Sequence, residues 1–518
     1  MMRRRTRKGP AARYDVRWAP ARPVPGADGT TLLTDHYAPV TTEPVPTILI
    51  RAPYIRGGFP WNWLFGVLFA EQGYHVLMQS SRGTGGSTGE FDAWSNEGRD
   101  GQAAVEWIRE QEFFTGDLFT VGGSYMAYSQ LALAHAPPPE WRAAVMQIAV
   151  VDPYRFYWAG GRFALERALV GGVAMYPQSN SFGANLRAVV RMQLRLGRML
   201  RRVPLIDAYR SLFTGPRPAI EAAMTSPSAG DPFWAGTDTG PAGATLPIPV
   251  SLSTGWHDLG TDQVIELYQA RRAAGLETDL LIGPWTHTNG YERDWEAFMT
   301  QALRRMRGDS PELPVRVHVG GADEWRDLPD WPPASIRPRR LHLGPDSLTE
   351  IPGPGYSIFR YDPEDPTPSI GGALQSSTQG TRDMAALERR GDVLVFTSPP
   401  LAGAVEVMGP VHASFDATTS AAGGDLFARL CDVDPAGKSI NICDGLTRIA
   451  AHGPTVVAMG STAHRFRAGH RIRLLVAGGA YPRWMRNYGT GEPIATATRL
   501  VATETTVRHT SVLEIPVV

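Results

Sequence analysis

The sequence predicts an α/β fold with a parallel sheet, interrupted by a helical insertion and followed by an all-β sandwich. Strand-like and helix-like segments alternate over the first 150 residues, and strand runs are missing from about Tyr154 to Ser228. Beyond about Pro311, short strand-like runs are separated by Gly, Pro and Asp turns. Strands that alternate with helices are typical of parallel sheets. A chain of 518 residues is long enough for two or three domains.

The first part of the chain supplies the predicted sheet. An antiparallel hairpin is expected over 16–42, around the turn at 26–29, and buried strands then alternate with amphipathic helices. The predicted strands are 46–51, 75–79, 118–121, 145–150, 248–253 and 279–282, and the predicted helices are 61–72, 97–110 and 129–136.

Short runs typical of an antiparallel sandwich fill the last 200 or so residues. They lie at 315–319, 393–396, 404–407, 411–415 and 472–476. We therefore predict the first part of the α/β core at 1–150, a helical cap at 151–240, the second part of the core at 241–310 and the β-sandwich at 311–518.

Charge and hydropathy exclude several classes of partner. Basic and acidic residues number 51 each, so no global field favours nucleic acid or an anionic membrane. The Arg-rich stretch 185–202 is expected to be a solvated helix face. No apolar run is long enough to span a membrane.

Cellular location follows from the N-terminus and the cysteines. Residues 1–13 are basic, but no apolar segment follows them, so a disordered tail is expected and not a secretory signal. Cys431 and Cys443 could form a disulfide, but two cysteines in so long a chain suit a reducing compartment better. We expect reduced core thiols and a cytoplasmic protein.

The stretch 119–128 contains the first candidate for chemistry. It reads as a short strand, a turn on Gly122 and Gly123, and a helix, with Ser124 at the turn. A serine at such a turn is the nucleophile elbow of the α/β-hydrolase fold. Met126 stands where the general G-x-S-x-G form has its second glycine. On this motif alone, a strand–helix turn that merely contains Ser stays open.

Two later residues complete a catalytic arrangement. A serine nucleophile needs a general base, and the base needs an orienting acid. Asp258 follows the strand 248–253, and His287 follows the strand 279–282. With Ser124 they take the chain order Ser, Asp, His of α/β-hydrolases, each in a loop after a strand. We therefore predict the triad Ser124, Asp258 and His287.

Other interpretations of these histidines and of one loop are weaker. His257 is adjacent to Asp258, and adjacent residues point apart, so it is expected to be structural or to line the pocket. No H-x-x-x-H spacing links His257, His287 and His75, so no metal is expected. The loop 82–89 matches neither the dinucleotide motif nor the Walker A loop, so no nucleotide site is expected.

An oxyanion hole is expected beside the nucleophile. It should use the backbone N–H of Tyr125 and a donor from an earlier strand-end loop. The loop after the strand 46–51 offers the Tyr54 hydroxyl, although a lone Tyr after Pro53 is explained as simply by packing in a surface turn.

Four motifs resemble those of the CocE/NonD family of serine hydrolases, relatives of the X-Pro dipeptidyl peptidases and the α-amino acid ester hydrolases. They are R-x-P-Y at 51–54, G-x-S-Y at 122–125, G-W-x-D at 255–258 and G-P-W-x-H at 283–287. Stretches at 321–326, 362–365 and 432–435 resemble parts of the family's C-terminal jelly roll. The resemblance spans nearly the whole chain.

This resemblance implies an α/β-hydrolase core, a helical cap and a jelly-roll domain that walls the pocket. It also implies that Tyr54 donates to the oxyanion. The chain departs from the family pattern at Ala127, where the family has Gly, and at Ser80, where the family's Q-D-x-R-G stretch has Asp. Neither change removes a predicted catalytic group.

We therefore expect a serine hydrolase that cleaves a carboxylic ester or amide through an acyl-enzyme, without a cofactor. The expected partner is a small-molecule ester or amide; nucleic acid and membrane are not expected, and a homodimer stays open. An acyltransferase, an X-Pro dipeptidyl-peptidase-like aminopeptidase and a non-catalytic binding protein are the alternatives. An ester with an apolar or aromatic acyl group is preferred, because no carboxylate cluster for a substrate amine stands out.

Overall fold

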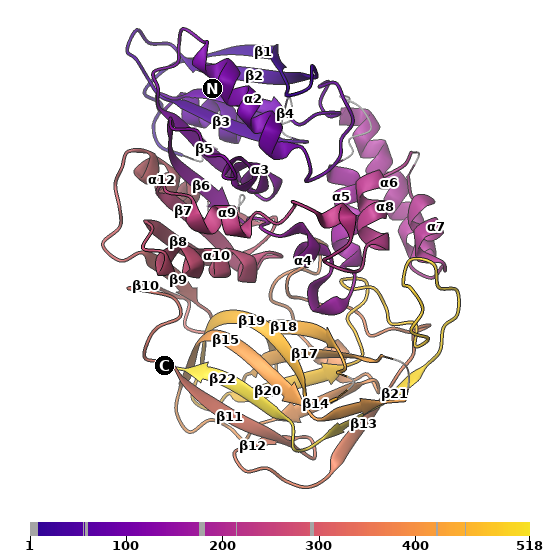
Figure 1. The fold of residues 1–518 in the computed structure, drawn as a ribbon. Coiled ribbons are helices and arrows are strands. Elements are labelled where there is room, and N and C mark those ends of the chain that lie inside the picture. The colour runs from indigo at the N-terminus through magenta and orange to yellow at the C-terminus, as the bar shows by residue number, and fades with distance from the viewer. Residues whose placement is uncertain are drawn as a thin grey trace.

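The computed structural model describes residues 9–54, 56, 61–175, 182–213, 215–290, 295–420, 423–450 and 452–518. Residues 1–8 lie outside these ranges, so most of the predicted basic tail is not described. Figure 1 shows a sheet flanked by helices at one end of the molecule, a group of helices beside it, and a β region at the other end. The predicted α/β, helical and all-β parts are confirmed.

The core is one sheet of ten strands in the order β1-β2-β4-β3-β5-β6-β7-β8-β9-β10. Strands from β4 to β9 along this order run parallel, whereas β1, β2 and β10 pair antiparallel. The strands are β1 Val16–Pro25, β2 Thr31–Pro39, β3 Thr47–Ala52, β4 His75–Ser80, β5 Leu118–Gly123, β6 Trp141–Gln147, β7 Val250–His257, β8 Thr278–Thr286, β9 Val315–Val319 and β10 Glu324–Leu328.

Helices pack on both faces of this sheet, as its continuous apolar strands require. Among the helices that the structure describes, none has the length and apolar character needed to cross a membrane. The core helices are η2 Asn62–Val67, α1 Leu68–Ala70, α2 Glu97–Arg109, α3 Tyr125–Leu133, α9 Gly240–Thr245, α10 Thr261–Ala273 and α12 Trp295–Met306.

The predicted cap is helical. Its Arg-rich helix α6 presents Arg191 and Arg195 to solvent and buries Met192 and Met199 against the core cluster, which supports the predicted solvated face. The cap elements are α4 Pro153–Tyr157, η3 Ala159–Gly161, α5 Leu165–Ala174, α6 Phe182–Met199, α7 Leu205–Arg210, α8 Pro218–Thr225 and η4 Pro232–Trp234.

The β region folds as a nine-stranded sheet whose two outermost strands, β18 and β19, lie against each other, together with a three-stranded sheet. Cys431 and Cys443 are buried here as free thiols. The elements are β11 Arg337–Gly344, β12 Ser347–Thr349, β13 Tyr356–Tyr361, α13 Ala385–Glu388, β14 Val393–Thr397, β15 Val405–Phe415, β16 Ala417–Thr419, β17 Asp425–Val433, β18 Ser439–Arg448, β19 Thr455–Phe466, β20 Arg471–Ala477, β21 Thr503–Arg508 and β22 Val512–Val517.

Two element assignments are corrected. The run 315–319, expected in the sandwich, forms β9 and pairs parallel with β8 in the core sheet. Its valines are buried on the core side, and an isolated apolar strand does not reveal which sheet it joins. The runs 404–407 and 411–415 form one strand, β15, whose register shifts between Pro410 and His412.

Candidate active site

The candidate site lies at the C-terminal ends of four parallel strands of the core. Tyr54 follows β3, Ser124 follows β5, Asp258 follows β7 and His287 follows β8. The chain moves from β3 to β4 on one side and then to β5 on the other, so Tyr54 and Ser124 flank the point where strand order reverses. Open α/β sheets bind ligands at such a point.

Ser124 occupies a sharp turn between β5 and α3. Its backbone has φ 57° and ψ −122°, a conformation that non-glycine residues rarely adopt. Its N–H donates to the Gln147 carbonyl at 2.9 Å, which anchors the turn to β6. Gly122 has φ 148°, and a Cβ there would lie 2.5 Å from the Met126 Cβ. A glycine at position 122, two residues before the serine, is therefore a steric requirement.

The structure brings Ser124, His287 and Asp258 into one chain of hydrogen bonds. The His287 Nε2 lies 3.0 Å from the Ser124 Oγ, and the His287 Nδ1 lies 2.7 Å from the Asp258 Oδ2. The Gly260 N–H donates to the other Asp258 oxygen at 2.9 Å. Because a carboxylate only accepts, Nδ1 carries the proton and Nε2 is free to accept from the serine. This is the geometry that a serine nucleophile needs.

The Tyr54 hydroxyl reaches the same point. It is close enough to hydrogen-bond with the Ser124 side chain and with the Tyr125 backbone N–H. Burial raises the pKa of Tyr54 to about 12, although these two hydrogen bonds lower it. The phenol therefore stays protonated at neutral pH. This O–H and the Tyr125 N–H are two donors that lie together beside the Ser124 side chain.

A buried ion pair supports the elbow from below, and sequence reasoning missed it. Arg51 Nη2 lies 3.1 Å from Glu97 Oε2, and both side chains are nearly inaccessible to solvent. The Tyr125 hydroxyl donates to the other Glu97 oxygen at 3.1 Å, and burial raises the pKa of Tyr125 well above its usual value. Arg51 belongs to the R-x-P-Y motif, but nothing in the spacing of Glu97 links it to Ser124.

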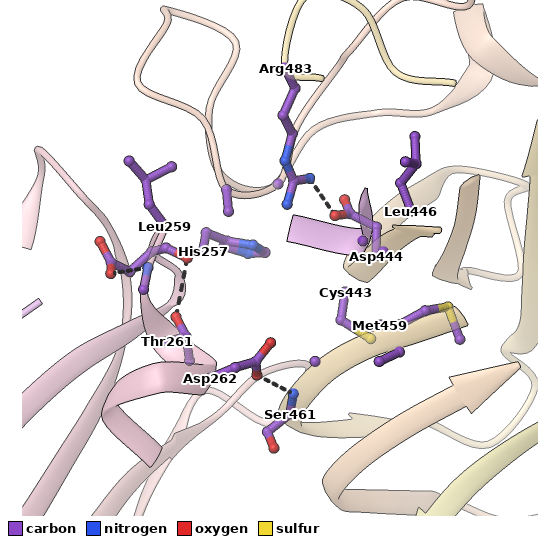
Figure 2. A pocket seen from close by; sticks show the side chains of 18 of the residues that line it. His257, Leu259, Thr261, Asp262, Cys443, Asp444, Leu446, Met459, Ser461 and Arg483 are labelled. Carbon is purple, nitrogen blue, oxygen red and sulfur yellow. Dashed lines mark hydrogen bonds and ion pairs between the residues drawn. The ribbon is translucent and has the colours of Figure 1, made fainter. Parts of the chain in front are cut away.

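His257 has a separate environment, as the sequence predicted. Its Nε2 lies 3.1 Å from the Thr381 Oγ1 of the β region, and it lines a cavity together with Arg483 and Asp444 (Figure 2). Burial, with contributions from nearby Arg429 and Arg483, lowers its pKa to about 4. His257 is therefore neutral at physiological pH and does not contact Ser124.

Other residues singled out in the sequence have contacts of their own. His75 bonds with His36, at 3.1 Å between ring nitrogens, and it begins β4, at the opposite end of the parallel strands from the triad residues. Among the described residues, no three His, Cys, Asp or Glu side chains are grouped as metal ligands. Ala127 is fully buried under the elbow, so the extra methyl is accommodated. Within the described part of the chain, Ser80 Oγ has no hydrogen-bond partner.

Taken together, the parallel sheet, the serine on its elbow and the Ser–His–Asp chain of hydrogen bonds define an α/β-hydrolase of the serine hydrolase class. The family model of the X-Pro dipeptidyl-peptidase (S15 family) matches residues 28–289, just over half of the 518 residues. The family model of the X-Pro dipeptidyl-peptidase C-terminal non-catalytic domain matches residues 308–513. The chain belongs to the S15 family.

Individual relatives agree with this membership. Cocaine esterase of Rhodococcus sp. (strain MB1 Bresler) is 28% identical, over 91% of this chain and 92% of that protein. An aminopeptidase of a marine sediment Thaumarchaeota archaeon superposes with a TM-score of 0.81 at 20% identity, covering 99% and 98% of the two chains. An α-amino acid ester hydrolase gives 0.75 at 19% identity, with coverage of 99% and 98%.

The two structural matches are below 25% identity and establish the fold. With the family match and the cocaine esterase match, they confirm the predicted resemblance to the CocE/NonD hydrolases and their X-Pro dipeptidyl-peptidase relatives.

Proposed function

We propose that this protein hydrolyses small-molecule carboxylic esters through an acyl-enzyme. Ser124 is the nucleophile, and His287 is the general base that removes its proton as Oγ attacks the ester carbonyl. Asp258 holds the imidazole in the required tautomer and stabilises the cation that forms. The Tyr54 hydroxyl and the Tyr125 N–H stabilise the oxyanion of the tetrahedral intermediate.

The first intermediate collapses by breaking the bond between the carbonyl carbon and the alcohol oxygen. The His287 imidazolium gives its proton to the leaving alkoxide, and the alcohol departs, leaving the acyl group on Ser124. A water molecule then loses a proton to His287 and attacks the acyl carbon. When this second intermediate collapses, Ser124 takes the proton back and the carboxylic acid leaves.

One observation carries this proposal: the unbroken chain from Asp258 through His287 to Ser124, with both contacts at 3.0 Å or less. The 28% identity to a cocaine esterase over nearly the full length supports an ester as the substrate class. The membership in a family described as X-Pro dipeptidyl peptidases favours one rival, release of an X-Pro dipeptide from a peptide N-terminus. An acyltransferase uses the same acyl-enzyme and stays open.

A substrate screen separates these candidates. Aryl and aliphatic esters, X-Pro anilides, and an ester with a competing alcohol or amine acceptor are incubated with the protein, and products are identified by mass. We expect the free acid from esters and slower release from X-Pro anilides. Faster turnover of X-Pro anilides supports the peptidase, and transfer of the acyl group to the acceptor supports the acyltransferase.

The activated nucleophile has its own test. The intact mass of the wild type is measured after brief exposure to a fluorophosphonate, beside Ser124→Ala. We expect one adduct on the wild type and none on Ser124→Ala. A well-folded wild type that takes up no reagent would remove the support for the triad and favour a binding protein.

The cellular location is a related proposal. Both cysteines are free and buried, and neither needs an oxidising compartment. We propose a reducing, cytoplasmic location, which cell fractionation with an antibody to the protein would test. Recovery in an extracellular fraction would contradict it.

A further inference from the structure

Arg167 connects the cap to the loop that carries the candidate catalytic acid. It lies in the first turn of α5 and is 9% exposed. Its Nη1 donates to the Phe156 carbonyl of the cap, and its Nη2 donates to the Leu259 carbonyl at 3.0 Å. Leu259 directly follows Asp258 in the chain. The guanidinium also lies over the Phe156 ring, 4.6 Å from its centre.

The guanidinium is buried without an ion-pair partner among the described residues, and its side-chain hydrogen bonds to them go to the two carbonyls. Burial lowers its pKa to about 10, with Arg483 adding to the decrease; Asp258, Glu166 and Tyr157 act in the opposite direction. A buried charge is costly, and carbonyl acceptors offset only part of that cost. A neutral side chain at this position would have a smaller free-energy cost of desolvation than the guanidinium.

A cavity of about 350 Å³ borders one face of the acid loop and is lined by Asp258, Leu259 and Arg167 among others. Figure 2 shows Leu259 and His257 on one side of this cavity and Arg483 with Asp444 on another. One face of the loop therefore adjoins this cavity, although Leu259 itself is buried in a core cluster.

Within β7 and α10, the loop is held by local hydrogen bonds. The Asp258 N–H donates to the Gly255 carbonyl at 2.9 Å, and the Thr261 hydroxyl donates to the Gly255 and Asp258 carbonyls at 2.6 and 3.2 Å. The bond from Arg167 to Leu259 differs from these because it comes from the cap. It ties the position of the acid to the position of the cap.

We propose that Arg167 is a positioning residue for catalysis, which fixes the Asp258 loop from the cap and keeps a positive charge beside the acid. This inference rests on the proposed function, because it assigns Asp258 its role as the triad acid. The hydrogen bond to the Leu259 carbonyl sets the position of Asp258 and, through it, the orientation of the His287 ring.

Three variants separate geometry, charge and simple packing. Arg167→Met removes both the hydrogen bonds and the charge, and Arg167→Lys keeps the charge but cannot reach both carbonyls with one ammonium group. Arg155→Met is the matched control: Arg155 lines the same cavity from the cap, but its side chain is half exposed and paired with Glu266.

The readout is the rate constant of fluorophosphonate labelling of Ser124, measured well below the melting temperature of each variant, beside a thermal melt. We expect Arg167→Met to be labelled about tenfold more slowly or worse. Arg167→Lys, which cannot keep both hydrogen bonds, should also be slower, and Arg155→Met should match the wild type.

A structural role alone would lower the melting temperature of Arg167→Met but leave the labelling rate of the folded protein within about twofold of the wild type, and that result overturns the proposal. If Arg167→Met does not fold, Arg167→Lys decides: labelling as fast as wild type contradicts positioning by Arg167. Absence of labelling on the wild type itself would instead count against the proposed function, so the two failures are distinguishable.

Discussion

The two halves of the candidate site are built differently. Ser124 is held from within the core, through Gln147 on β6 and the Arg51–Glu97 pair beneath the elbow. The acid side takes contacts from outside the core, because Arg167 of the cap bonds to the loop after Asp258. Its neighbour His257 bonds to Thr381 of the β region.

Ser124 and Asp258 therefore depend on different parts of the molecule for their positions. The elbow can reach its final geometry once the core sheet has folded. The acid loop has local hydrogen bonds as well, but its full set of contacts forms only when the cap has docked, because the bond from Arg167 comes from the cap. A substitution that weakens docking of the cap should therefore lower activity while the backbone turn at Ser124 keeps its geometry.

The largest effect is expected inside the core. Arg51→Met leaves Glu97 charged and buried without its partner, and should lower the free energy of unfolding by about 3 to 5 kcal/mol. Urea unfolding followed by circular dichroism measures the change. Arg109→Met is the control, because the Arg109–Glu140 pair at 2.8 Å is partly exposed, with side-chain exposures of 41% and 20%, and its loss should cost about 1 kcal/mol or less. Equal losses in the two variants would contradict a special role for the buried pair.

A second ion pair, between the cap and the β region, sharpens the comparison by its pH dependence. Arg162 Nε lies 2.6 Å from Asp425 Oδ1, and both side chains are buried. Burial raises the pKa of Asp425 to about 6 from 3.8, although Arg162 lowers it. The folded state therefore holds this proton more tightly than the unfolded state does. Protonation of Asp425 therefore contributes to the free energy of unfolding. This contribution is largest below about pH 4 and is lost as the pH rises through about 6, by about 3 kcal/mol in all.

Asp425→Asn, which cannot titrate there, isolates this contribution. We expect the wild type to lose about 2 kcal/mol relative to Asp425→Asn between about pH 4 and pH 7 in urea unfolding. Glu140→Gln, at a partly exposed pair, should show little such change. A difference between wild type and Asp425→Asn that does not vary with pH would contradict the prediction.

The smallest effect is expected at the contact from the β region. Thr381→Val removes the hydroxyl that bonds to His257 and leaves a buried ring nitrogen without that partner. Because Thr381 itself is exposed, the loss should be about 1 kcal/mol in unfolding free energy, with ester hydrolysis changed by less than about threefold. Thr378→Val in the same loop is the control. A tenfold loss of activity would show that the β region controls the triad directly.

Local patterns predicted the parts of the site that local backbone geometry determines. Ser124, Asp258 and His287 each follow a strand, and the ends of parallel strands meet at one edge of a sheet. The structure does place these three side chains in contact, while their catalytic roles remain a proposal for the experiments above. The α/β, helical and all-β layers were predictable for the same reason, because periodicity is a local property.

Contacts between distant segments could not be predicted in this way. Glu97 supports Tyr125 across 28 positions of sequence, and Arg167 reaches Leu259 across 92. Neither pair leaves a spacing signal, because their meeting depends on how α2 packs on α3 and how the cap docks. The assignment of β9 failed similarly: its burial pattern fits either sheet, and only its pairing with β8 decides.

The backbone of Ser124 has one consequence for how this chain evolves. Its conformation is one that glycine adopts freely and serine adopts at a cost of about 1 to 3 kcal/mol. Mutational drift that acted on stability alone would replace this serine with glycine. Selection for stability alone would thus remove the residue on which the proposed chemistry depends. Selection for catalysis has to maintain it.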